Sequence, residues 1–145
     1  MSHILVCKTA IKSLQDLQEG LMAMGFPAAA IEVGENLEIK IWAGMRFPVD
    51  VKVDGAKVSM HRDFGFTKNN GVYELQMDDM DECVIKSRVR EWGKTEIQEG
   101  QTFASRLGQW CSAVGAKRHL SKWAPSAEIE QQEDGKLRVS ARRAW

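Results

Sequence analysis

Short segments in which apolar and polar side chains alternate constrain the fold of this chain more than any other feature of its sequence. Residues 37–41 read LEIKI, residues 49–53 read VDVKV and residues 71–77 read GVYELQM. A period of two turns the apolar side chains to one face of a strand and the polar ones to the other. We therefore predict strands that cover a core on one side and face water on the other.

Turn sequences between these segments predict how the strands are connected. They lie at Asp54-Gly55, Asn69-Asn70-Gly71 and Asp134-Gly135. Each supplies the positive φ that a tight hairpin turn requires. Three hairpins imply a largely antiparallel sheet. The run from His3 to Thr9 is rich in branched apolar residues, which predicts one further, buried strand.

Two segments have the period of about 3.6 residues that is typical of amphipathic helices. The first begins after Ser13, with Asp16 three residues later as in a capping box, and stops at Gly25. The second extends from about Gln101 to Lys122, with Gly115 either inside it or ending it early. The predicted apolar faces are Leu14, Leu17, Leu21 and Met24 in the first helix, and Phe103, Leu107, Trp110, Cys111 and Val114 in the second.

These elements predict a single α+β domain over residues 1–145, with two main amphipathic helices packed on one face of a largely antiparallel sheet. The segment from Met80 to Gly100 has an ambiguous period, and we expect a connection that contains a short helix. Both long helices precede a hairpin-like sequence, so two similar units are expected to contribute to one sheet.

The chain ends in KLRVSARRAW, at residues 136–145, which alternates as a last strand of that sheet. Leu137, Val139 and Ala141 then face inward, and Arg138 faces water. The same phase turns the ring of Trp145 toward the inner side. We expect this ring to cap the core at the sheet edge.

The charge of the chain is balanced overall but divided along its length. Twenty basic and twenty acidic residues give a net charge of zero, which excludes the broad positive field of many nucleic-acid binders. Residues 1–82 carry eight Lys and Arg against thirteen Asp and Glu, whereas residues 83–145 carry twelve against seven. The three scattered cysteines and the lack of a secretory or membrane-spanning segment predict a soluble, cytoplasmic protein without disulfides.

Several short sequences resemble one family. They are MSH with KTAI close behind at the start, DFGFTKNNGVYELQMDD in the middle and AEIEQQEDGKLRVSARRAW at the end. In this order they resemble the hypothetical chloroplast reading frame thirty-five family of cyanobacteria, algal plastids and some phages. The family is functionally uncharacterised, so the resemblance implies a compact α+β protein and no particular reaction.

No motif for catalysis or cofactor binding stands out, and we assign no catalytic, cofactor-binding or metal-binding residue. His3 and Cys7 lie about 13 Å apart on a strand, too far to share one zinc ion. The acidic stretch from Asp78 to Glu82 could hold Mg²⁺, but it lacks the spacing of a calcium loop. We therefore interpret it as a helix start or a solvated loop.

A sharper alternative is single-stranded nucleic-acid binding, because cations and aromatic rings are interleaved in the C-terminal half. The candidate residues are Arg88, Arg90, Trp92, Lys117, Arg118, Lys122, Trp123, Arg142, Arg143 and Trp145. The preferred hypothesis is a non-enzymatic adaptor that binds another protein or associates with itself, oriented by the opposite charges of the two halves. A small enzyme or a metal protein ranks third.

Overall fold

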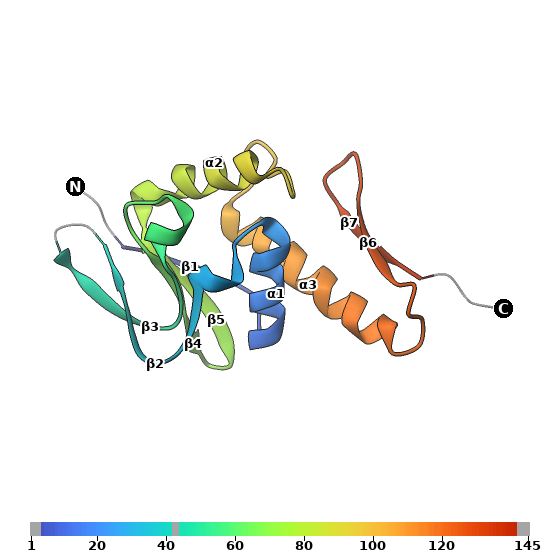
Figure 1. The fold of residues 1–145 in the computed structure, drawn as a ribbon, viewed down its shortest axis with the longest axis horizontal. Helices are drawn as coiled ribbons and strands as arrows, with labels where there is room; N and C mark the ends of the chain where they lie inside the picture. The colour runs from blue at the N-terminus through green and yellow to red at the C-terminus, as the bar shows by residue number, and fades with distance from the viewer. Residues whose placement is uncertain (1–3, 42–43, 142–145) are drawn as a thin grey trace.

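The computed structural model describes residues 4–41 and 44–141. Within these residues, five strands form one sheet in the order β1-β5-β4-β3-β2, and every neighbouring pair is antiparallel. The strands are β1 (Ile4–Lys8), β2 (Ile31–Lys40), β3 (Arg46–Val53), β4 (Phe64–Asn69) and β5 (Val72–Asp78). Three helices accompany the sheet: α1 (Leu14–Met24), α2 (Glu82–Trp92) and α3 (Phe103–Ser121). The α+β prediction is confirmed (Figure 1).

Helix α1 forms where its sequence predicts. The Ser13 hydroxyl accepts a hydrogen bond from the backbone N–H of Asp16 at 3.2 Å, which satisfies one free amide of the first turn. Gly25 ends the helix in the left-handed region, at φ 114°. The predicted face is buried at Leu17, Leu21 and Met24.

Helix α3 also forms as predicted and runs through Gly115. Two acceptors stabilise its start: the Thr102 hydroxyl binds the N–H of Ser105 at 3.0 Å, and the Glu82 carboxylate binds the N–H of Phe103 at 2.8 Å. Glycines let α1 and α3 approach closely, since a Cβ on Gly20 would lie 2.4 Å from the sulfur of Cys111.

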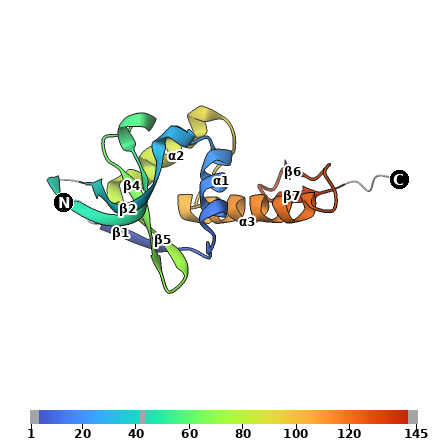
Figure 2. The ribbon, with the colours of Figure 1, turned by 60° about the horizontal axis from the view of Figure 1, so that its bottom comes forward.

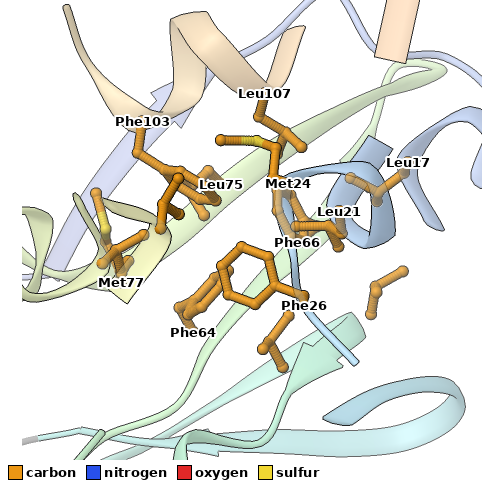
Figure 3. Close-up of a cluster of buried hydrophobic side chains, with 14 of the residues drawn as sticks. Leu17, Leu21, Met24, Phe26, Phe64, Phe66, Leu75, Met77, Phe103 and Leu107 are labelled. Atoms are coloured by element: carbon orange, nitrogen blue, oxygen red, sulfur yellow. The ribbon is translucent and has the colours of Figure 1, made fainter. Parts of the chain in front are cut away.

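The main core lies where helices α1, α2 and α3 meet one face of the sheet (Figure 3). Phe64 is its centre: its ring packs edge-on against Phe26, Phe66 and Phe103, with centroids 5.5–6.1 Å apart. Tyr73, with Leu75 and Met77 beyond it, projects from β5 into the same core, as the alternating pattern predicts. The sequence expectation of helices on one face is met, with α2 as the predicted short helix.

The hairpin of β2 and β3 bends back over the other face. A register shift between Val33 and Leu37 interrupts its pairing. Beyond the bend, Ile39, Ile41 and Val49 form a second buried cluster with Ile4 of β1. The Asp63 carboxylate accepts from the N–H of Lys40 at 3.0 Å and so fastens the bent strand to the start of β4.

Two smaller expectations are corrected. Strand β1 is half-buried rather than buried, because it forms an edge that pairs only with β5. Asp54-Gly55 does not make a tight hairpin. The Asp54 carboxylate caps a 3₁₀ turn, η3 (Gly55–Val58), and the loop that follows still brings β4 antiparallel to β3. The Asn70-Gly71 turn is a two-residue hairpin, as predicted.

The C-terminal hairpin contradicts the expectation of a single sheet. β6 (Glu128–Gln131) and β7 (Leu137–Ser140) pair across the Asp134-Gly135 turn, but they form a separate two-stranded sheet on α3 (Figures 1 and 2). The reason is the length of α3, whose 19 residues span about 28 Å. The helix carries the chain away from the five-stranded sheet, so the hairpin returns onto the helix itself. Leu137 and Val139 are partly buried there, Ala141 is exposed, and Trp145 lies outside the described residues.

Candidate functional site beneath the C-terminal hairpin

A buried polar cluster lies where the C-terminal hairpin meets α3. The helix places Arg106 and Trp110 four residues apart, on one face, with side chains that are 1% and 7% exposed. The loop between α2 and α3 adds Thr95, which is also buried. The hairpin adds Gln131 at the end of β6 and the backbone carbonyl of Gly135. Three separate segments therefore converge on the Arg106 guanidinium.

The Thr95 hydroxyl is the junction of this cluster. It accepts hydrogen bonds from Nε and Nη2 of Arg106, at 3.1 and 2.8 Å, and from the indole N–H of Trp110 at 2.9 Å. It donates in turn to Oε1 of Gln131 at 2.9 Å. The Gln131 amide then donates to the carbonyl of Lys94 at 2.9 Å. This chain of bonds joins α3, the loop and the hairpin.

Arg106 has hydrogen-bond partners but no ion-pair partner. Its guanidinium donates only to neutral acceptors: the Thr95 hydroxyl, the side-chain carbonyls of Gln109 and Gln131, and the Gly135 backbone. Among the residues that the structure describes, no carboxylate lies within 4.0 Å of it. Burial lowers the pKa of Arg106, and the charge of Glu96 acts in the opposite direction. The charge is therefore buried and only weakly compensated.

A cavity of about 390 Å³ opens beside this cluster. Arg106, Thr95 and Gln131 form part of its wall, and Arg90 and Lys94 contribute from the end of α2 and the following loop. Glu96 and Glu133 also line it. The cavity thus has charged groups of both signs around a buried cation.

The sequence-predicted basic-aromatic residues of α2 do not form an open binding face. Arg88 donates to the backbone carbonyl of Ser59 through both Nε and Nη2, at 3.1 and 3.0 Å. Trp92 packs edge-on against Phe26, with ring centroids 4.9 Å apart. Arg90 is exposed and lines the polar cavity. Only Arg90 of these three is available to a ligand.

The predicted residues of α3 lie apart from those of α2, at the far end of the helix (Figures 1 and 2). Arg118 holds α3 to α1, because it forms ion pairs with Asp16, at 2.7 Å, and with Glu19. Lys117 and Lys122 are exposed, and Trp123 is 79% exposed. The remaining three candidates, Arg142, Arg143 and Trp145, lie outside the described residues. The ten residues do not form one continuous face in the part of the chain that is described.

The sequence analysis missed Arg106, Thr95 and Gln131. One signal was present for Arg106, which lies three residues after Phe103 and four before Trp110, inside the apolar face of the helix. A charged residue in that position is buried unless the helix rotates. Thr95 and Gln131 carry no comparable signal, because only the folded chain brings them to the arginine.

The acidic stretch at the start of α2 has structural partners. Asp78 caps the N–H of Met80 at 2.9 Å, Asp81 forms an ion pair with Arg62 at 2.8 Å, and Glu82 caps α3. Over residues 4–41 and 44–141, no group of three or more His, Cys, Asp or Glu side chains is arranged to hold a metal ion. No helix in the same ranges is long and apolar enough to cross a membrane.

Comparison with known proteins identified no relative of this chain. No family model, no curated protein and no solved structure matches the chain, so the resemblance to the chloroplast reading frame family stays a prediction.

Proposed function

We propose that the protein is a non-enzymatic binding module that docks to another protein through its C-terminal arm. The arm is defined as residues 112–140, the second half of α3 together with the β6–β7 hairpin. It extends away from the five-stranded sheet in both views of the ribbon (Figures 1 and 2). An extended element of this kind offers surface to a partner, beyond the side chains such as Arg118 that hold it to α1.

Trp123 is the observation that carries this proposal. Its side chain is 79% exposed, the largest fraction among the exposed large hydrophobic residues of the described chain. Exposing an indole to water costs free energy, and tryptophan is strongly enriched among the residues that dominate binding at protein interfaces. An exposed indole at the end of a projecting helix supports a docking role.

The same arm has a second feature that suits docking. A groove of about 400 Å³ runs between α3 and β7, lined by small residues of the helix and by Leu137 and Val139 of the strand. The polar side chains Gln109 and Lys136 also line it. A groove lined by apolar side chains together with a few polar ones has the composition of a small interface.

Pull-down from the native cells tests this function with a matched pair of variants. Trp123→Ala removes the exposed ring, and Met80→Ala removes an exposed side chain, 62% accessible, in the 3₁₀ turn that precedes α2. We expect one stoichiometric protein with the wild type and with Met80→Ala, and at least a tenfold loss with Trp123→Ala. Equal capture by both variants, or no stoichiometric partner at all, would contradict the proposal. If the partner is a second copy of this chain, analytical sedimentation of the purified protein should show self-association. Trp123→Ala should abolish that self-association as well.

A second candidate, single-stranded nucleic-acid binding, is supported by the exposed lysines Lys117 and Lys122 near Trp123. For this function, the dissociation constant for a labelled oligonucleotide should rise steeply with salt. Trp123→Ala should cost about 1–3 kcal/mol, because a base stacks on the ring. A dissociation constant that changes neither with salt concentration nor in Trp123→Ala would exclude this candidate.

A further inference from the structure

We infer that the cavity beneath the C-terminal hairpin binds a small molecule that carries a single carboxylate or phosphate group. This site is separate from Trp123, and the inference does not depend on the proposed docking function. Its argument rests on the charges that line the cavity, on their lack of partners and on the size of the space.

The first step is the buried charge of Arg106. All five N–H groups of the guanidinium have neutral acceptors, so the side chain is held rigidly and has no donor left for a ligand. Its positive charge nevertheless remains without a close carboxylate in the described structure. Because the interior screens charge poorly, this cation creates a positive potential in the adjoining cavity. An anion placed there would compensate it.

The second step is the presence of free donors. Arg90 and Lys94 line the same cavity, and within the described ranges neither side chain forms a hydrogen bond or an ion pair. A guanidinium and an ammonium together can bind the oxygens of one carboxylate or phosphate group by charge-assisted hydrogen bonds. The cavity therefore combines the positive potential of Arg106 with two cationic donors that have no partner among the described residues.

The third step limits the charge of the ligand. Glu96 and Glu133 also line the cavity, so three cationic and two anionic side chains surround it. Like charges repel, and a polyanion such as a nucleic-acid backbone would meet both carboxylates. One anionic group beside Arg90 and Lys94 avoids this repulsion.

The size of the cavity fits a small molecule. Its volume of about 390 Å³ lies at the lower end of the range of roughly 300–1,000 Å³ found for ligand pockets. The ligand would contact the end of α2, the loop and the hairpin turn together, because the lining residues come from all three. Binding should therefore stabilise the attachment of the hairpin to the rest of the protein.

Isothermal titration calorimetry at low ionic strength tests the inference, with inorganic phosphate, acetate and tripolyphosphate as probes. Binding of phosphate or acetate is expected, with tripolyphosphate no tighter than phosphate. Lys94→Gln and Arg90→Gln should each weaken that binding at least tenfold. Lys117→Gln, which neutralises an exposed lysine on the far part of α3, should leave it unchanged.

Three results would overturn the inference. They are the absence of phosphate and acetate binding at millimolar concentration, equal weakening by Lys117→Gln, and tighter binding of tripolyphosphate than of phosphate. Trp123→Ala should leave phosphate binding intact, so the two proposals fail separately.

Discussion

The main core and the C-terminal hairpin are stabilised by different kinds of contact. In the core, apolar side chains of the sheet and the three helices exclude water almost completely. In the hairpin, β6 and β7 have four residues each, and their side chains are mostly exposed or partly buried. The hairpin is attached through the bonds that join Arg106 and Thr95 to Gln131 and Gly135, together with Ile129 and Leu137, which pack against the edge of the core. An isolated two-stranded hairpin is at best marginally stable, so this attachment decides whether it forms.

The comparison teaches that alternation predicts a strand but does not predict which surface the strand packs on. Residues 37–41 and 136–141 alternate in the same manner. The first segment covers an apolar cluster of the main sheet, and the second lies on a helix, beside a polar cluster and with only Leu137 packed against the core. The difference depends on the length of α3 and on Arg106.

The largest effect is expected from the core. Phe64→Ala removes a fully buried ring that contacts Phe26, Phe66 and Phe103. The free energy of unfolding should fall by about 3–5 kcal/mol, from lost burial and the cavity left behind. Urea denaturation followed by far-UV circular dichroism measures this value. A loss below about 1 kcal/mol would show that the core is not centred on this ring.

Arg106→Met should act on the hairpin and spare the sheet. The methionine leaves the Gly135 carbonyl without its guanidinium donor and leaves Gln131 with the Thr95 hydroxyl alone, at a cost of about 1–3 kcal/mol. Amide exchange of residues 128–140 should become faster, with exchange in β4 and β5 unchanged. Equal acceleration in both regions would contradict the proposed division of the molecule.

Two glycine substitutions sharpen the account of how α3 is anchored to α1. Gly20→Ala places a Cβ 2.4 Å from the Cys111 sulfur, and this overpacking should cost about 1–3 kcal/mol. Gly108→Ala is the matched control in α3, where an added Cβ meets nothing within 4 Å. It should stabilise the helix by up to about 1 kcal/mol. Thermal denaturation of both variants measures these changes in stability. Equal stability of the two variants would mean that α1 and α3 are not closely packed at Gly20.

The smallest effect concerns pH and the same contact between α1 and α3. Burial raises the pKa of Cys111 to about 12, and the charge of Asp16 adds to the shift. The folded state therefore favours the neutral thiol. Ionisation of the thiol in the unfolded state lowers stability as the pH rises above about 9. At one pH unit above this value, near pH 10, the loss in the free energy of unfolding should approach about 1.4 kcal/mol. Urea titrations at pH 8 and pH 10 should show this loss in the wild type relative to Cys111→Ala. An identical pH dependence in the two proteins would mean that the thiol is accessible to water.

Local features of this fold were predictable from the sequence. The Ser13 cap, the Gly25 stop and the Asn70-Gly71 turn depend on residues within a few positions of one another. The hairpin at Asp134-Gly135 was predictable for the same reason. Its position on α3 was not, because it depends on contacts between segments far apart in the sequence.

The candidate site was still less predictable. Arg106 interrupts an apolar face, which indicates a buried charge, but its partners Thr95 and Gln131 lie 11 and 25 residues away. The interleaved cations and rings in the C-terminal half suggested one surface. Folding instead places Trp92 against the core and pairs Arg118 with α1. Composition alone does not distinguish a cation that binds a ligand from one that holds two helices together.

Native-state hydrogen exchange of the wild-type protein in increasing urea tests the central claim most directly. If a polar cluster attaches the hairpin to α3 outside the main sheet, amides of β6 and β7 should exchange by local opening at low urea. Amides of β4 and β5 should exchange only by global unfolding. The same opening free energy and the same urea dependence in all four strands would contradict the account.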